Sequence, residues 1–217
     1  MLAREMGMRP GRVEAITYAG MLHDVGKLGV PTKVLQKSGP LTGEEFAAIQ
    51  LHPMRGLEIV REIGFLDEAL AGIMHHHERV DGRGYPLGLA GDEIPEFARV
   101  IAVADAFDSM TSTRSYRGAR DVRTTLGELE RCAGTQFDPR MVGALVAALK
   151  HEPWTTVAPA EQRSLDVEMV VPSFDHDDPR TNVPAEPRPQ LAAEAARAAE
   201  LNGQLIRRRR SMRSSWR

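Results

Sequence analysis

Hydrophobic residues recur at intervals of three and four positions through much of the first 151 residues, which is the spacing of one face of an α-helix. Thr42 and Glu45 have the spacing of a capping box, and Asp67, Asp121 and Asp138 stand where helix N-caps are expected. These signals predict helices over residues 10–23, 43–63, 67–76, 96–112, 122–132 and 139–150. The expected fold class is therefore all-α.

The helix predicted over 43–63 carries the apolar residues expected to form its buried stripe, namely Phe46, Ile49, Ile59, Val60 and Ile63. His52 falls in the middle of this helix, near the same face. The connection over 78–94 is rich in glycine and long for a compact bundle. Long connections of this kind are more often functional than accidental, so this loop is a candidate part of a site.

A change in composition after residue 151 divides the chain. Residues 152–190 contain seven of the fourteen prolines and almost no amphipathic pattern, which predicts a linker or a disordered segment. Residues 191–217 begin as an Ala-rich helix and end in an arginine-rich tail. We therefore expect a helical domain over 1–151, a Pro-rich segment over 152–190 and a short basic helix with its tail over 191–217.

Composition and charge narrow the class of protein. The formal net charge of the 217 residues is -2, which argues against a protein that binds nucleic acid through bulk charge. The single cysteine, Cys132, excludes an internal disulfide framework and fits a reducing compartment. No apolar run approaches the roughly 18–20 residues of a membrane span. A cytoplasmic protein without a membrane span or a specific nucleic-acid partner is expected.

Histidines and carboxylates gather in the predicted helices. Five of the seven histidines fall between residues 23 and 77, and Asp24 and Asp105 accompany them. Imidazole nitrogens and carboxylate oxygens on packed helices suit a divalent metal such as Fe, Mn or Zn. His23 and Asp24 are adjacent at a predicted helix end, where both side chains can turn inward.

Asp24 has two oxygens and can bridge two cations, which would lower the pKa of a shared water and yield hydroxide for attack on a phosphodiester. Lys27 follows one turn after His23 and can neutralise phosphate charge. Each residue alone has a plainer interpretation: a single buried histidine such as His52 is more often hydrogen-bonded in the core than bound to a metal. The hypothesis of a metal site therefore rests on the combination of these residues and not on any one of them.

Three strings of residues resemble one family. HDVGKLGVP over 23–31, HHERVDGRGYP over 76–86 and VADAFDSMTSTRSYR over 103–117 are similar to the HD-GYP domain, a branch of the HD metal-dependent phosphohydrolases. The resemblance covers about residues 2–150 and implies an all-helical bundle. It implies hydrolysis of cyclic di-GMP to pGpG and often to GMP, at a centre of divalent metals. Two ions are expected here, with iron or manganese favoured over zinc or magnesium.

The resemblance also implies roles for single residues. The expected metal ligands are His23, Asp24 as the bridge, His52, His76, His77 and Asp105. Asp24 and Lys27 would be catalytic, and the expected substrate contacts are Lys27, Tyr85, Arg114 and Arg117. The residues expected to support the ligands or to shape the loop are Glu78, Asp81, Gly82, Gly84 and Pro86.

The sequence departs from the family pattern in two places. The family's bundle has a further helix upstream that supplies a histidine to the first metal, whereas no histidine precedes His23. We therefore expect that the chain begins inside the domain and that the first metal site lacks one ligand. Ser115 stands where the family usually has proline, and little effect is expected.

Three functions follow as hypotheses. The first is a cyclic di-GMP phosphodiesterase. The second is a catalytically weak or inactive domain that binds cyclic di-GMP or a protein partner, and the third is an HD phosphohydrolase of another nucleotide. Expected protein partners are sensor, receiver or diguanylate-cyclase-type proteins, or a second copy in a homodimer.

Overall fold

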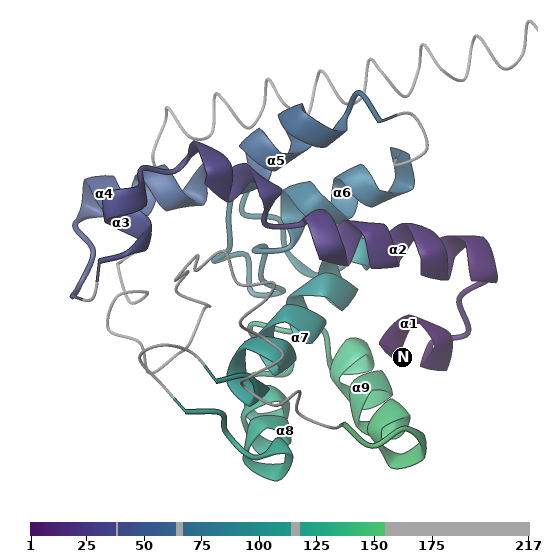
Figure 1. The fold of residues 1–217 in the computed structure, drawn as a ribbon. Coiled ribbons are helices and arrows are strands. Elements are labelled where there is room, and N and C mark those ends of the chain that lie inside the picture. Colours follow the sequence, from purple (N-terminus) through teal and green to yellow (C-terminus); the bar gives the residue numbers. More distant parts are fainter. Residues whose placement is uncertain (38, 64–66, 114–117, 155–217) are drawn as a thin grey trace, which may run out of the picture.

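The computed structural model describes residues 1–37, 39–63, 67–113 and 118–154, and in this part of the chain the fold is built from helices (Figure 1). The elements in chain order are α1 (Leu2–Glu5), α2 (Pro10–Leu22), the 3₁₀ helix η1 (Val25–Gly29), α3 (Thr32–Leu35), α4 (Gly43–Gln50), α5 (His52–Val60), α6 (Asp67–His75), the 3₁₀ helix η2 (Gly91–Glu93), α7 (Glu96–Thr111), α8 (Val122–Arg131) and α9 (Pro139–His151). The predicted all-α class is confirmed. The predictions for residues 155–217 lie outside the described residues.

Three of the predicted helix caps are confirmed, at Thr42, Asp121 and Asp138, whereas Asp67 is itself the first residue of α6. The Thr42 hydroxyl accepts from the Glu45 N–H, and the Glu45 carboxylate accepts from the Thr42 N–H, so the predicted capping box is formed. Asp121 caps α8 by accepting from the Thr124 N–H, and Asp138 caps α9 by accepting from the Arg140 N–H. These side chains satisfy N–H groups that the first helical turn leaves without partners.

The prediction of a single helix over 43–63 is wrong, because this segment forms two helices, α4 and α5, which meet at Leu51. Pro53 has no N–H to donate to the Ile49 carbonyl four residues earlier, and Pro is well tolerated only in a first turn. His52 therefore begins α5 rather than standing in mid-helix. The stripe is also narrower than predicted, since Ile59 and Ile63 are exposed.

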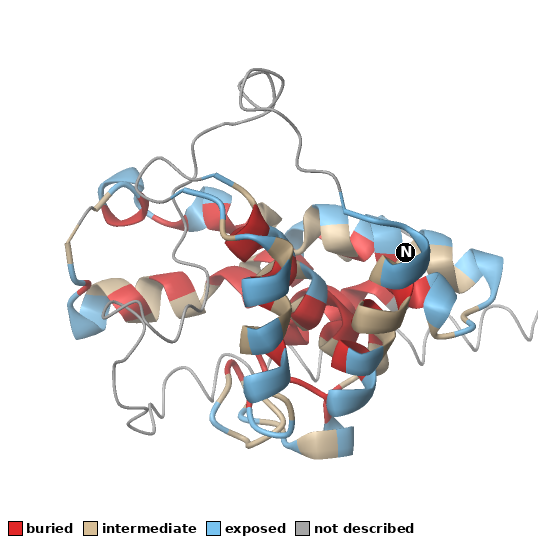
Figure 2. Cartoon of the chain, turned by 90° about the horizontal axis from the view of Figure 1, so that it is seen from below, coloured by how far each residue is buried: buried red, intermediate tan, exposed pale blue. Residues whose placement is uncertain are grey.

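The apolar core lies where α2, α6 and α7 meet, and α5, α8 and α9 pack around them. In Figure 2 the buried residues gather where helices face one another, and the outward faces are largely exposed. Ile73 on α6 and Val103 on α7 are completely buried. A second, smaller cluster packs α3 against α4 through Val34, Leu35 and Phe46. Helices α6 and α7 are thus fixed from several sides.

One close approach sets the geometry of the later site. A Cβ atom placed on Gly26 of η1 would lie 1.9 Å from the backbone oxygen of His52, so only glycine fits there. This contact places η1, which directly follows His23 and Asp24, against the start of α5. Among the described residues, no helix combines the length and the apolar composition that a membrane crossing requires.

Candidate metal centre

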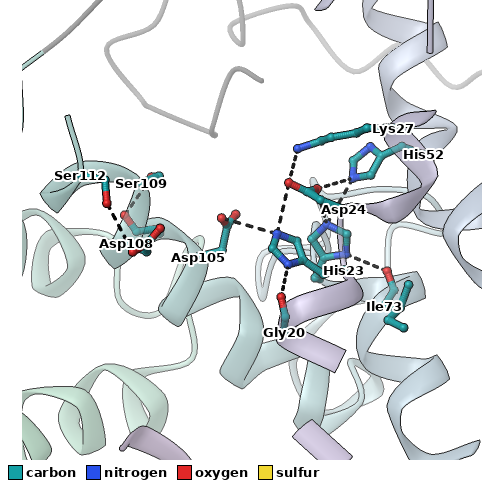
Figure 3. Close-up of polar contacts among 12 residues, drawn as sticks. Gly20, His23, Asp24, Lys27, His52, Ile73, Asp105, Asp108, Ser109 and Ser112 are labelled. Carbon is teal, nitrogen blue, oxygen red and sulfur yellow. Dashed lines mark hydrogen bonds and ion pairs between the residues drawn. The ribbon is translucent and has the colours of Figure 1, made fainter. Parts of the chain in front are cut away.

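The candidate centre forms where four segments of the fold converge (Figure 3). His23 and Asp24 come from the turn between α2 and η1, His52 from the start of α5, and Asp105 from the middle of α7. His76 and His77 directly follow α6. The structure thus gathers all the residues expected as ligands, although they are as many as 82 positions apart along the chain (105 − 23).

The first part of the centre, the histidine half, consists of Asp24, His52, His76 and His77. One ligand atom from each of these residues lies within 4.8 Å of the others. The Oδ1 atom of Asp24 lies 3.3 Å from Nε2 of His52 and 3.9 Å from Nε2 of His76. The two Nε2 atoms are themselves 3.3 Å apart. The distances suit donors that converge on one cation.

Backbone carbonyls orient the two rings. Nδ1 of His52 donates to the Ile49 carbonyl, and Nδ1 of His76 donates to the Ile73 carbonyl, each at 2.7 Å. A carbonyl can only accept, so the proton of each neutral ring is on Nδ1 and the lone pair is on Nε2. Two facing lone pairs repel, and the Oδ1 atom of Asp24 is buried beside them without a hydrogen-bond partner. A cation between these atoms would satisfy all of them, so the residues fit a divalent metal.

The second part, the carboxylate half, consists of His23, Asp24 and Asp105. Nε2 of His23 lies 3.3 Å from Oδ2 of Asp24 and 3.6 Å from Oδ1 of Asp105. Its Nδ1 donates to the Gly20 carbonyl at 2.6 Å, which again leaves Nε2 as the ligating atom. The Nζ atom of Lys27 lies 2.5 Å from the same Oδ2 atom. Asp24 therefore presents one oxygen to each half (Figure 3).

The pKa values of the histidines are shifted in opposite directions in the two halves. Burial lowers the pKa of His52, His76 and His77, so that these rings are neutral near pH 7 and in the form that binds metals. Burial would also lower the pKa of His23, but the Asp24 and Asp105 carboxylates outweigh it and hold that pKa well above the ordinary value.

The two carboxyl groups of the centre remain ionised. Burial alone would raise the pKa of Asp24, but the Lys27 ammonium and the charged His23 ring lower it well below its usual value. His23 lowers the pKa of Asp105 in the same way, against the effect of burial. In the metal-free protein, protons and an ammonium thus supply the positive charge of the carboxylate half.

Glu78, which directly follows His77, holds the glycine-rich loop over 78–94 together. Its buried carboxylate accepts from the Leu87 N–H at 2.7 Å and the Leu89 N–H at 3.0 Å. A Cβ atom on Gly84 would lie 2.4 Å from the Arg79 nitrogen, so the loop folds back tightly on its own start. This fold places Tyr85 in a stack on His77, with ring centroids 4.8 Å apart.

Two further contacts close the loop. Arg79 donates to both oxygens of Asp81, at 3.0 and 2.7 Å, and Asp81 forms a β-bridge with Ala90. Gly82 has a φ of 75°, and the Tyr85–Pro86 peptide bond is cis. Of the residues expected to shape the loop, Glu78 and Asp81 make contacts within it and Gly84 packs against its start. Their effect on the chemistry stays a prediction.

The residues expected to contact substrate are placed differently from the ligands. Lys27 is 3% exposed and directed at Asp24, and Tyr85 is 5% exposed and packed on His77. Arg114 and Arg117 lie outside the described residues, as does Ser115. Their roles toward substrate stay predictions.

Sequence reasoning missed the groups that orient the rings and one residue beside them. Gly20, Ile49 and Ile73 each accept from a histidine three residues later, a role of the backbone that residue type does not reveal. Gln136 lines a pocket together with Asp105, His76 and His77. Every histidine has a carbonyl three residues before it, so the sequence held no signal for these contacts.

Comparison with known proteins agrees with this geometry. The sequence profile of the HD domain family matches residues 1–141. The chain belongs to the HD domain family, in its HD-GYP branch.

Two curated relatives illustrate the similarity. The chain is 40% identical over 148 residues to the cyclic di-GMP phosphodiesterase response regulator RpfG of Xanthomonas campestris pv. campestris, covering 67% of this chain and 39% of that protein. It is 35% identical over 149 residues to 3'3'-cGAMP-specific phosphodiesterase 3 of Vibrio cholerae, covering 69% of this chain and 32% of that protein. The chain thus spans less than half the length of these curated relatives.

A solved structure shares the fold. Bd1817, an HDG"Y"P protein from Bdellovibrio bacteriovorus, superposes with a TM-score of 0.55 at 23% identity, covering 69% of this chain and 48% of that one. At this level of identity the likeness concerns the fold alone.

Proposed function

We propose that this chain is the hydrolytic part of a divalent-metal-dependent phosphodiesterase that cleaves cyclic di-GMP to pGpG or GMP. The observation that carries the proposal is Asp24, whose two oxygens face two separate sets of donors, as a shared ligand of two cations requires. We propose two ions, iron or manganese, with His52, His76 and His77 around one and His23 and Asp105 around the other.

The residues of the chain supply the setting for this chemistry. When bound, such cations act as Lewis acids and lower the pKa of water, which supplies the nucleophile for phosphodiester cleavage near neutral pH. The neutral rings of the histidine half hold their lone pairs toward the centre, and Asp24 fixes the spacing of the two halves. Lys27, together with Arg114 and Arg117, would neutralise phosphate charge, and Tyr85 would define the wall beside His77.

Two other candidates have specific support. The similarity to a 3'3'-cGAMP-specific enzyme makes a mixed cyclic dinucleotide a second candidate substrate. The carboxylate half has few ligands, and its Asp24 oxygen is held by Lys27, which favours a domain that binds the nucleotide but turns it over slowly. The cytoplasmic location and the sensor, receiver, cyclase-type or homodimer partners stay predictions of the sequence.

The test is turnover by the purified chain. The metal-free protein is loaded with Mn(II), or with Fe(II) without oxygen, and incubated with cyclic di-GMP or 3'3'-cGAMP while linear products are separated by chromatography. Product from cyclic di-GMP that disappears with a chelator supports the proposal. Faster turnover of 3'3'-cGAMP would favour the second substrate. Nucleotide binding without product would overturn the hydrolytic function and favour the binding domain.

A further inference from the structure

Lys27 is an unusual residue to find inside a cation site. Its side chain is 4% exposed, and its Nζ atom lies 2.5 Å from Oδ2 of Asp24. In the part of the chain that the structure describes, Asp24 is the only carboxylate within 4 Å of this ammonium. Lysine is rarely buried unless its charge is paired, so the contact with Asp24 is what allows the ammonium to be there.

The ammonium competes with a cation for the same oxygen. Oδ2 is the atom of Asp24 that faces His23, and a cation in the carboxylate half would need it as a ligand. An ammonium and a divalent cation bound to one oxygen would repel each other strongly in a partly desolvated site. The Oδ1 atom faces His52 and His76 instead, and Lys27 does not contact it.

We propose that the Lys27 ammonium is the built-in counter-ion of Asp24 in the metal-free protein, and that it must leave Oδ2 before a cation binds in the carboxylate half. The inference rests on the metal-dependent function proposed above. It makes binding ordered: the first cation enters the histidine half, and the second enters only when Lys27 is displaced. The displaced ammonium would stay near the centre, where it would pair with an anionic phosphodiester. Binding of the second cation and binding of the substrate would therefore favour each other.

Mn(II) binding to the full chain tests the inference directly, with free Mn(II) counted by electron paramagnetic resonance. The wild type should bind one ion tightly and a second more weakly. Lys27→Met, which keeps the length of the side chain without its charge, should strengthen the second ion about tenfold or more and the first by less. Lys37→Met is the matched control, because Lys37 also pairs with a carboxylate, Glu45 at 2.6 Å, away from the centre. It should leave both affinities unchanged.

Two further readouts separate the possible failures. Lys27→Arg keeps the charge and should keep the weak second site, and Mn(II) should raise the melting temperature of Lys27→Met more than that of the wild type. An unchanged or weaker second site in Lys27→Met would overturn the inference and leave the proposed function standing. Failure of the wild type and of Lys27→Met to bind any Mn(II) would overturn both. If Lys27→Met does not fold, the same comparison with Lys27→Gln decides.

Discussion

The two halves of the centre share Asp24 but are stabilised in different ways. In the histidine half, neutral rings are oriented by backbone carbonyls, and their lone pairs face one another across 3.3 Å. In the carboxylate half, ionised carboxylates are balanced by Lys27 and by a charged His23. One half is therefore arranged for a cation before any arrives, whereas the other already contains positive charge that a cation must replace.

Metal binding therefore depends mainly on geometry in the histidine half and mainly on charge in the carboxylate half. Orienting neutral rings through their Nδ1 atoms adds no net charge to the interior, so such a site can remain empty in a folded protein. Buried carboxylates need counter-charge in every state of the protein. The same fold can thus contain a ready site and a regulated site on either side of Asp24, whose oxygens lie 3.3 Å from Nε2 of His23 and 3.9 Å from Nε2 of His76.

Asp24→Ala should have the largest effect, because it removes an oxygen from both halves. We expect loss of both ions and a fall in activity of more than about a hundredfold, beyond the range typical of residues that only support ligands. Metal analysis of the purified variant and nucleotide turnover measure these outcomes. Glu44→Ala, an exposed carboxylate on α4, is the control and should behave as wild type. Two bound ions in Asp24→Ala would refute the bridging role.

His52→Ala and His23→Ala should have smaller and unequal effects, since each removes a ligand from one half only. Loss of His52 should abolish the tight ion, whereas loss of His23 should leave the tight ion in place and remove the weak one. Each should lower activity by about tenfold to a hundredfold or more. Mn(II) titration of the two variants in parallel is the measurement. Identical binding curves would mean that the centre does not consist of two separable halves.

The metal-free protein should show opposite pH dependence in the two halves. The pKa of His52, His76 and His77 is lower in the folded protein than the ordinary 6.5, so the unfolded chain binds more protons and the free energy of unfolding falls as the pH drops below about 6.5. The raised pKa of His23 contributes stability that is present below 6.5 and lost as the pH rises through that raised value.

Urea unfolding between pH 5.5 and 9 with a chelator can separate these contributions. Each proton taken up or released on unfolding changes stability by about 1.4 kcal/mol per pH unit. His52→Gln should reduce the loss of stability on the acid side, and His23→Gln should remove the decline on the alkaline side. The carboxylates of Asp24 and Asp105 do not contribute here, because their lowered pKa values place their effect below this range. Equal slopes in both variants would contradict the assignment.

The sequence predicted much of this arrangement, for physical reasons that differ by residue. Helix periodicity and capping side chains are local, so the all-α class and the caps at Thr42, Asp121 and Asp138 could be predicted. Adjacent ligands at helix ends, such as His23 and Asp24, are also visible as a pattern. Those residues converge as expected, while their role as ligands awaits experiment.

Other features depend on contacts that a linear pattern does not contain. The break before His52 had a local cause in Pro53, but its consequence, that the Ile49 carbonyl accepts from the His52 ring, depends on the three-dimensional arrangement. Nothing in the sequence distinguishes Gly26 from the other glycines, because its need for a missing Cβ arises from the close approach of η1 to α5. The direction of Lys27, toward Asp24 instead of solvent, depended on the packing around both residues.

Glu78→Gln should have the smallest effect on metal binding, and the effect should be limited to the histidine half. The amide keeps one acceptor but turns an N–H₂ group toward one of the loop N–H groups of Leu87 or Leu89, which leaves a buried donor unsatisfied at a cost of about 1–3 kcal/mol. A looser loop weakens the stack of Tyr85 on His77, so the tight Mn(II) ion should bind less strongly, while the weak ion is unaffected. Glu93→Gln makes the same change at an exposed carboxylate that accepts from the Ala90 N–H at 3.0 Å, and it should alter neither stability nor affinity. If Glu78→Gln weakened the two ions equally, the loop would support the whole centre rather than the histidine half.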